Sequence, residues 1–300
     1  MAAPAAVVVI GSVNTDLIVR VPRHPRPGET VLGGPSTTSP GGKGANQALA
    51  AARRGARTAL VGAVGSDEDA VLALALLHEA GVDLTGVRHL DGGTGLAIIT
   101  VAADGENAIV VVPGANARVQ PDQVDDEVLA AAGVCVLQGE VPAEVVVHAV
   151  ARCTELGTRV LLNLAPPLAL PPGVLRAADP LVVNEHEARA ALAQLTDAEV
   201  AEAELPGALH AAGVRSVVVT LGARGAVVVD AAGTTAVPAP RVEVRDSTGA
   251  GDAFVGALAG QLAAGASLVD AARLAARVGA ATVRGDGAQP SYPWAGEAMP

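Results

Sequence analysis

A glycine-rich run, Asp246-Ser-Thr-Gly-Ala-Gly-Asp252, precedes an apolar segment typical of a helix. Gly249 and Gly251 allow the backbone to turn its N–H groups toward one point, and the start of a helix adds positive potential there. Such a site suits a phosphoryl group during transfer, when negative charge spreads over its oxygens. A carboxylate at Asp252 could accept the proton of an attacking hydroxyl. An ordinary glycine turn with Asp252 near the helix cap explains the same fragment without catalysis.

A second glycine-rich run is Gly41-Gly-Lys-Gly-Ala-Asn-Gln47. Lys43 offers a positive charge, Asn46 offers both donors and an acceptor, and the glycines allow the backbone to approach a ligand closely. The run is not a P-loop, because the first glycine of that pattern is missing and Gly44 stands where Ser or Thr would hold Mg²⁺. The alternative is a helix N-terminus with flexible glycines.

Two polar residues follow the first apolar run of the chain. Asn14 and Asp16 are two residues apart, so in an extended segment they point to the same side, as a pair that binds neighbouring hydroxyls would. The segment lacks Gly-x-Gly-x-x-Gly, which argues against a dinucleotide-binding site. An Asx-type turn is the simpler explanation of this pair taken alone.

Further polar groups occur where predicted strands end: Gln138-Gly-Glu140, Asn163 and Asn184-Glu-His-Glu187. Asn184 and Glu187 could share a helical face and orient water molecules on Mg²⁺, or they could simply cap the helix. The loop Thr220-Leu-Gly-Ala-Arg-Gly225 could surround the phosphates and base of a nucleotide, and a plain turn explains it nearly as well.

These residues need a scaffold, and the hydrophobic pattern predicts one. We expect strands at about 6–10, 58–64, 134–138, 159–163, 181–183 and 216–220, and helices at about 43–53, 68–80, 143–156, 185–193, 251–264 and 268–283. This alternation predicts an α/β fold: a doubly wound, mostly parallel sheet with helices on both faces. Ligands of such sheets bind outside the carboxyl ends of the strands, where the polar motifs fall.

Two β-rich excursions, at about 14–40 and 94–113, interrupt the alternation. They contain β-like pieces at 15–21, 29–32, 96–101 and 108–112, the last two joined by the hairpin signal Asp104-Gly105. A second hairpin is expected at 226–229 and 234–237. We expect a single domain over 1–300, in which the two excursions pair as a small β-sheet lid.

Composition restricts the partners. The net charge of −11 and the presence of only one Phe, one Tyr and one Trp argue against a nucleic-acid partner. Cys135 and Cys153 lack metal-ligand spacing and are expected to be small buried hydrophobic residues, with a bridge left open. No apolar stretch reaches membrane-spanning length, and the run 5–10 lacks a preceding basic region, so we expect a cytoplasmic protein without a membrane partner.

Together and in this order, the motifs resemble those of the PfkB carbohydrate kinase family, in its ribokinase branch. The match extends from about Val7 to Trp294, and its most specific pieces are Gly41–Gln47, the Asn184-x-x-Glu187 run and Thr248–Asp252. The resemblance implies a ribokinase-like domain, a β-sheet lid that often pairs two subunits, and phosphoryl transfer from ATP with Mg²⁺. It also implies a monovalent cation, normally K⁺.

The resemblance assigns the residues to four groups. Asp252 would be the catalytic base, with Gly249, Ala250 and Gly251 as the anion hole. The sugar contacts would be Asn14, Asp16, Gly42, Lys43, Asn46 and Glu140. The nucleotide contacts would be Asn184, Glu187, Thr220, Gly222, Arg224 and Gly225. The cation ligands would be Asp246, Thr248, Thr282, Gly285, Gly287 and Ser291, with Asp246 and Ser291 offering side-chain oxygens and the others backbone carbonyls.

The expected reaction is transfer from ATP to the primary hydroxyl of D-ribose, in a homodimer paired through the lid. Another acceptor remains the nearest alternative: deoxyribose, fructose, a ketodeoxy sugar acid or a nucleoside. The scarcity of aromatic residues disfavours a nucleoside held between rings. A sugar-binding sensor without catalysis is the alternative from a different class, although a mere binder has no need of a base at Asp252.

Overall fold

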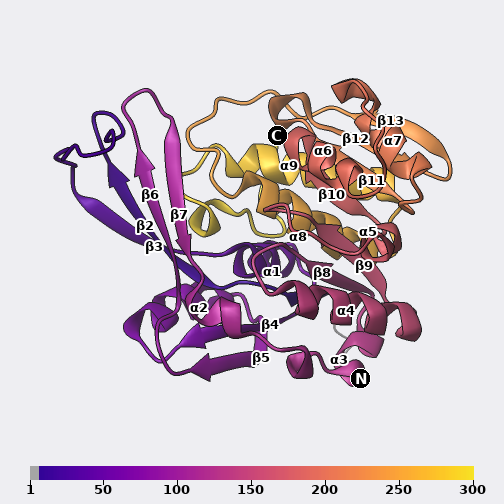
Figure 1. Cartoon of the computed structure of the whole chain (residues 1–300), viewed down its shortest axis with the longest axis horizontal. Helices are drawn as coiled ribbons and strands as arrows, with labels where there is room; N and C mark the ends of the chain where they lie inside the picture. Colours follow the sequence, from indigo (N-terminus) through magenta and orange to yellow (C-terminus); the bar gives the residue numbers. More distant parts are fainter. Residues whose placement is uncertain (1–6) are drawn as a thin grey trace.

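The computed structural model describes residues 7–300, and a nine-stranded sheet runs through its centre (Figure 1). The strand order is β13-β12-β11-β10-β9-β8-β1-β4-β5. The seven strands from β11 to β5 are parallel, and β12 and β13 are antiparallel additions at one edge. The bounds are β1 Val7–Ile10, β4 Thr58–Gly65, β5 Asp83–Leu90, β8 Val134–Leu137, β9 Arg159–Asn163, β10 Leu181–Asn184, β11 Val217–Thr220, β12 Ala226–Asp230 and β13 Gly233–Val237.

Helices cover both faces of this sheet, because the central strands are apolar on both sides. In β1, Val7 and Val9 belong to one hydrophobic core and Val8 and Ile10 to another. The first core contains α1 (Lys43–Arg53), α2 (Glu68–Glu79), α8 (Ala250–Ala263) and α9 (Leu268–Thr282). The second contains α3 (Asp126–Ala131), α4 (Ala143–Leu156), α5 (Pro172–Ala177), α6 (Glu185–Ala193) and α7 (Leu205–Ala211). The fold is therefore the doubly wound α/β architecture expected from the sequence.

A smaller four-stranded sheet projects beside the main one, in the order β3-β2-β6-β7 (Figure 1). Its strands are β2 Asn14–Arg20, β3 Ser36–Gly41, β6 Gly95–Val101 and β7 Asn107–Val112. The pairing of β2 with β6 is parallel and joins Asn14 to Gly95 and Asp16 to Ala97 across the two excursions, while the other pairings are antiparallel. The sheet carries Asn14 and Asp16 to the carboxyl-end edge of the main sheet.

Most predicted elements occur within one or two residues of their expected bounds, although the first strand was expected from Ala6, which lies outside the described residues. The expected strand at 29–32 is wrong: that stretch has no regular structure, and the third strand of the small sheet is Ser36–Gly41. Prolines and glycines flank the stretch, and Leu32 is 87 % exposed, so it has no neighbour to pair with. Strand β5 and the short helices α3, α5 and α7 were not expected.

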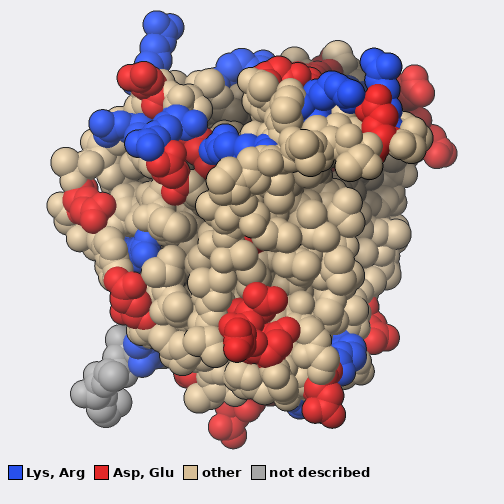
Figure 2. Space-filling model, turned by 90° about the vertical axis from the view of Figure 1, so that its left-hand side faces the viewer, with Lys and Arg blue, Asp and Glu red and all other residues tan. Residues whose placement is uncertain are grey.

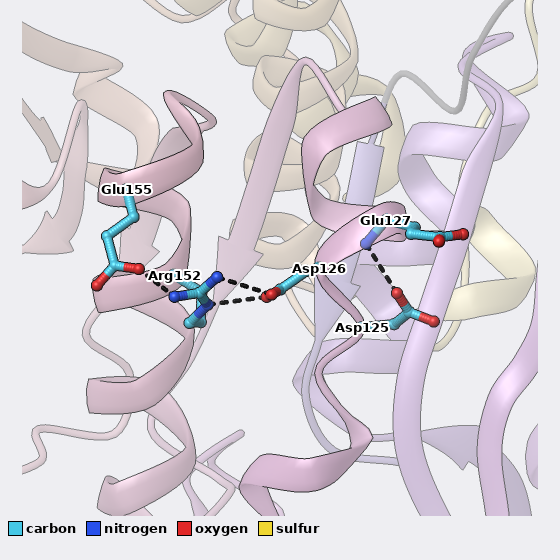
Figure 3. A network of polar contacts seen from close by, with 5 residues as sticks. All are labelled: Asp125, Asp126, Glu127, Arg152 and Glu155. Carbon is cyan, nitrogen blue, oxygen red and sulfur yellow. Dashed lines mark hydrogen bonds and ion pairs between the residues drawn. The ribbon is translucent and has the colours of Figure 1, made fainter.

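An ion-pair network joins α3 to α4 away from the predicted site (Figure 3). Asp126 accepts from Arg152 Nε and Nη2 at 2.8 and 2.7 Å, and Arg152 also pairs with Glu155. The Arg152 hydrogen bond holds the pKa of Asp126 below its ordinary value. Asp125 caps α3 by accepting from the backbone N–H of Glu127. These contacts are exposed and have a structural role.

The cysteines and the helix lengths bear on two expectations from the sequence. Cys135 and Cys153 are both buried and unbridged, as small hydrophobic residues. Over residues 7–300, none of the helices is both long and apolar enough to cross a bilayer.

Candidate active site

The expected base lies at the start of α8, where the glycine run turns into the helix. Gly249 is the N-cap residue with φ 73°, and a Cβ there would lie 2.5 Å from Ala288 Cβ and 2.6 Å from the Tyr292 hydroxyl. Only glycine fits this left-handed conformation and this close contact. The first turn of α8, with Ala250 and Gly251, lies at the positive end of the helix dipole, and the N–H of Ala250 makes a long hydrogen bond of 3.3 Å to the Ser247 carbonyl. The geometry suits an anion beside Asp252.

Asp252 is 8 % exposed, and two amide side chains from α1 hold its carboxylate. Asn46 Nδ2 donates to Asp252 Oδ2 at 2.9 Å, and Gln47 Nε2 donates to Oδ1 at 2.8 Å. The run Gly41–Gln47 therefore does form a helix N-terminus, the alternative considered for it, while two of its side chains contact the expected base.

Polar groups of the expected sugar side gather around the start of α1. Glu140 Oε2 accepts from Ser12 Oγ at 2.5 Å and from the backbone N–H of Lys43 at 3.1 Å. Asn14 Oδ1 accepts from Asn116 Nδ2 at 2.7 Å. Five of the six expected sugar contacts thus lie on β2, in α1 or at its N-cap, and Glu140 joins them through hydrogen bonds.

The two glycines before Lys43 let β2 pass close to this loop. A Cβ at Gly41 would lie 2.2 Å from Asp16 Oδ1, and one at Gly42, where φ is 89°, would lie 2.7 Å from the backbone N of Asn14. Side chains at these positions would displace Asn14 and Asp16 from the site.

The charges of the site are strongly coupled. Burial raises the pKa of Asp16 to about 7, with further increases from Glu140 and Asp252 and a partial offset from Lys43. The pKa of Lys43 is raised mainly by Asp252, against the effect of burial, so the ammonium group keeps its proton. Burial also raises the pKa of Glu187. A single fixed positive side chain thus faces several carboxylates, an arrangement common in functional sites.

A cavity of about 190 Å³ opens beside Asp252, at the carboxyl ends of β9, β10 and β11. Its lining residues are Lys43, Asn163, Ala165, Val182, Val183, Asn184, Glu187, Thr220, Gly249, Gly251, Asp252 and Val255. Thr220 ends β11 and reaches this cavity, as expected of a nucleotide contact. Asn184 and Glu187 form a reciprocal capping box at the start of α6, with both hydrogen bonds at 2.8 Å. Asn184 and Glu187 therefore cap α6 and also line the cavity.

The remaining nucleotide candidates lie on the loop after β11. Gly222 and Gly225 have φ values of 57° and 95°, and a Cβ at Gly225 would lie 2.0 Å from the Val237 carbonyl oxygen. Arg224 is outside the cavity and pairs with Glu185 at 2.6 Å and Glu202 at 3.7 Å. The structure therefore brings Thr220 to the cavity but not the Arg224 side chain.

The expected cation ligands converge from three segments. Asp246 Oδ1 accepts from the N–H and hydroxyl of Thr248, and Asp246 Oδ2 accepts from the N–H of Gly287 at 2.9 Å. Ser291 Oγ donates to the Gly287 carbonyl oxygen at 2.7 Å. A Cβ at Gly285 would lie 2.7 Å from Ser291 Cβ, so only glycine keeps this cradle open.

The side chains of the cradle mainly hold its own loop. The hydroxyl of Thr282 donates to the Val278 carbonyl at 3.0 Å, and the carbonyl oxygen of Thr282 accepts from the N–H of Gly285 at 3.0 Å. The Asp246 carboxylate, the Ser291 hydroxyl and the Gly287 carbonyl lie close together, and such oxygen donors suit a hard cation. Among residues 7–300, no group of three or more His, Cys, Asp or Glu side chains is placed to hold a metal ion.

Several residues of the site had no assigned role in the sequence. Ser12 and Asn116 hold Glu140 and Asn14, Gln289 Nε2 donates to Asn46 Oδ1 at 3.0 Å, and the Tyr292 hydroxyl donates to the Gly249 carbonyl at 3.1 Å. Ser12 lies two residues before Asn14, in the polar segment after the first apolar run, and this position was the available signal. The others are isolated polar residues far away in the sequence.

In sequence and in overall fold, the chain is similar to known carbohydrate kinases. The family model described as "pfkB family carbohydrate kinase" matches residues 4–295. The ribokinase of Schizosaccharomyces pombe is 37 % identical over 300 residues, covering 96 % of this chain and 94 % of its own. A crystal structure of ribokinase from Thermotoga maritima has a TM-score of 0.89 and 29 % identity, with 97 % and 96 % of the two chains covered. The Arabidopsis thaliana ribokinase complexed with ribose and ATP has a TM-score of 0.86 and 32 % identity, with 97 % and 96 % covered.

Proposed function

Because the chain belongs to the PfkB family of carbohydrate kinases, we propose that it is an ATP-dependent ribokinase, converting D-ribose and ATP to D-ribose 5-phosphate and ADP. One observation carries the assignment: the Asp252 carboxylate lies at a boundary, because it lines the cavity at the strand ends together with Lys43 and also accepts from the Asn46 amide of the expected sugar side. A base at that boundary can reach a sugar on one side and a phosphoryl group on the other. The relatives named ribokinase and the solved complex with ribose and ATP support the choice of sugar and donor.

The residues divide the chemistry between them. The side chains of Asn14, Asp16, Lys43, Asn46 and Glu140 and the backbone at Gly42 bind the sugar hydroxyls. Asp252 takes the proton of the primary hydroxyl, whose oxygen then forms a bond to the γ-phosphorus. The bond from that phosphorus to the bridging oxygen breaks, and ADP leaves with the electron pair. The N–H groups at Gly249, Ala250 and Gly251 receive the negative charge of the phosphoryl oxygens.

The nucleotide would occupy the cavity and the loop beyond it. Thr220, Gly222 and Gly225 would bind its phosphates and base, and Arg224 would first have to leave Glu185. Asn184 and Glu187 would orient water ligands of Mg²⁺, which neutralises phosphate charge when it is bound with ATP. Few protein carboxylates are needed for this, since Mg²⁺ usually keeps several water molecules.

A monovalent cation would be held by Asp246, Thr248, Thr282, Gly285, Gly287 and Ser291. When bound, K⁺ would supply a positive charge that gathers the carbonyl oxygens of this loop. The loop is joined to the anion hole, because Tyr292 donates to the Gly249 carbonyl. A loop ordered by the bound cation would therefore hold the backbone of Gly249 in the position needed for the anion hole.

The proposed substrate is tested by ADP release in a coupled assay with D-ribose, deoxyribose, fructose, a ketodeoxy sugar acid and a nucleoside, each with and without K⁺. We expect D-ribose to give the highest kcat/KM and K⁺ to increase it. A different best acceptor would reassign the substrate within the family. Sugar binding without ADP release from any acceptor would contradict the kinase activity and favour a sensor.

We further propose that the small sheet closes over the sugar site as a lid and pairs two subunits. β7 is its edge strand, and Ile109, Val110, Val111 and Val112 are all 45 % or more exposed. Figure 2 views the side of the molecule where this sheet lies, and a broad area there carries no charged side chain. Exposed apolar patches and open strand edges mark interaction surfaces.

Since ATP is the donor, we also propose that the enzyme is in the cytoplasm.

Val110→Asp should dissociate this dimer. Val110 is 62 % exposed, and the β-sheet register places it on the face opposite Asp16, so the change avoids the sugar side. Burying its charge should weaken dimerisation by about 2 kcal/mol or more, or roughly 30-fold in Kd. Light scattering with size-exclusion chromatography measures the mass. Val71→Asp is the matched control, because Val71 is 76 % exposed on α2, outside the sheet. A monomeric wild-type protein would contradict the proposal.

A further inference from the structure

Two helices cross where the base is held. Gly256 lies one turn after Asp252 in α8, and a Cβ there would lie 2.4 Å from the Gln47 carbonyl oxygen and 2.6 Å from Ala50 Cβ. The missing side chain lets the backbone of α1 approach α8 at this turn. Residues four apart share a helical face, so the same crossing brings Gln47 against Asp252.

Gln47 is completely buried, and its amide group is engaged in every direction. Nε2 donates to Asp252 Oδ1 at 2.8 Å and to Asn163 Oδ1 at 3.0 Å, while Oε1 accepts from Gln138 Nε2 at 2.8 Å. A carboxylate only accepts hydrogen bonds, so the amide must present its nitrogen to Asp252. The hydrogen bond from Gln138 Nε2 to Gln47 Oε1 is consistent with the same orientation. The amide of Gln47 therefore cannot rotate without losing several buried hydrogen bonds.

Asn46 differs in its free hydrogen-bonding capacity. Its Nδ2 donates to Asp252 Oδ2 and its Oδ1 accepts from Gln289, which leaves one N–H and one lone pair for a ligand. Gln47 has no N–H left and is fully buried, whereas Asn46 is 6 % exposed. Asn46 can contact the sugar directly, whereas Gln47 can act only through Asp252.

We propose that Gln47 is a positioning residue that fixes the rotation of the Asp252 carboxylate and reserves Oδ2 as the proton-accepting oxygen. Oδ1 is bound by Gln47 from the buried side, and Oδ2 faces the side of Asn46 and the sugar. In the step, the proton of the primary hydroxyl goes to Oδ2 and its oxygen bonds to the γ-phosphorus. ADP departs with the electrons of the broken bond, and Oδ1 keeps its hydrogen bond to Gln47 throughout. This inference rests on the proposed kinase function.

The first test is Gln47→Met, which keeps approximately the length of the side chain and removes both N–H donors. We expect kcat to fall about 10- to 100-fold, because misplaced reacting groups cost that much. KM for the sugar and its Kd by calorimetry should stay within about threefold, since Gln47 does not touch the substrate. A kcat within about threefold of wild type, or a loss confined to KM, would overturn the inference.

Gln123→Met is the matched control for the loss of a buried glutamine. Gln123 is 8 % exposed and donates to the Gly62 carbonyl at 2.9 Å, away from Asp252. Gln123→Met should lower the melting temperature by about as much as Gln47→Met does and leave kcat and KM unchanged. An equal loss of kcat in this control would mean that general destabilisation explains the effect, and would overturn the inference.

Gln47→Glu gives a second readout that a purely structural role would not change. The new acid can donate to Asp252 Oδ1 only while it is protonated, and its carboxylate repels Asp252. The ratio of kcat in the variant to kcat in wild type should therefore rise at least about fivefold between pH 8.5 and pH 6. A flat ratio would contradict the proposed contact. Wild type that releases no ADP would refute the kinase and this inference together, whereas active wild type with an equally active Gln47→Met would refute only the inference.

Discussion

Asp252→Asn should lower kcat by about 10²- to 10⁴-fold, the range that a general base contributes, while sugar binding changes much less. The substitution keeps the size of the side chain and removes the carboxylate that we propose takes the hydroxyl proton. It also puts one NH₂ group opposite either Asn46 or Gln47, both of which donate to Asp252 in the wild type. Part of the loss would therefore come from a disturbed amide pair as well as from the missing base.

ADP release under saturating sugar and ATP measures kcat, and calorimetry with the sugar alone measures Kd. Asp270→Asn is a suitable control, because Asp270 also lies in the first turn of a helix, α9, but is exposed and pairs with Ser267 and Arg273. It should cost a little stability and no activity. Near-wild-type turnover in Asp252→Asn would show that another group removes the proton.

The main sheet was predictable because its central strands are buried on both faces. Such strands read as continuous apolar runs, as in Val7–Ile10 and Val134–Leu137, and each is followed by a polar or glycine-rich motif. The edge of the sheet gives no such signal. Asp83–Leu90 has one buried residue, Val87, among exposed and half-buried ones and contains a glycine, so its strand was missed. Ser36–Gly41 has no large apolar residue and becomes a strand only because β2 pairs with it.

The candidate site was predictable where its chemistry is local. Gly249 must be glycine because of its own φ and its contact with Ala288, and this requirement is visible as a glycine in the motif. The hydrogen bonds that hold the site are different: Gln289 meets Asn46 across 243 positions of sequence, and Asn116 meets Asn14 across 102. Single polar residues at such separations have no periodicity or spacing that marks them. Their partners are set by the packing of whole elements.

At Asp16, the ionised carboxylate that we propose binds the sugar lowers the stability of the folded protein. Burial, Glu140 and Asp252 raise its pKa from 3.8 to about 7, so the folded protein retains a proton that the unfolded chain releases above about pH 4. The folded state therefore becomes less stable as the pH rises from about 4 to about 7, and the full penalty is present above pH 7. At about 1.4 kcal/mol per pKa unit, it amounts to as much as about 4 kcal/mol. A sugar that donates hydroxyl hydrogen bonds to Asp16 would favour the charged form and offset this penalty.

Asp16→Asn should thus raise stability and abolish tight sugar binding. Without sugar, the melting temperature at pH 8 should exceed that of wild type by several degrees. The difference should shrink as the pH falls and vanish below about pH 3, where both folded and unfolded wild type hold the proton. In wild type, the sugar affinity should fall about tenfold from pH 8 to pH 6, because Asp16 becomes protonated. In Asp16→Asn, KM for the sugar should be at least about 100-fold higher than in wild type and should not change with pH over this range. Calorimetry for the sugar and scanning calorimetry for unfolding measure the two halves of the argument. A variant that is less stable than wild type at pH 8, or a wild-type affinity that does not change with pH, would mean that the Asp16 carboxylate is already ionised at neutral pH without a ligand.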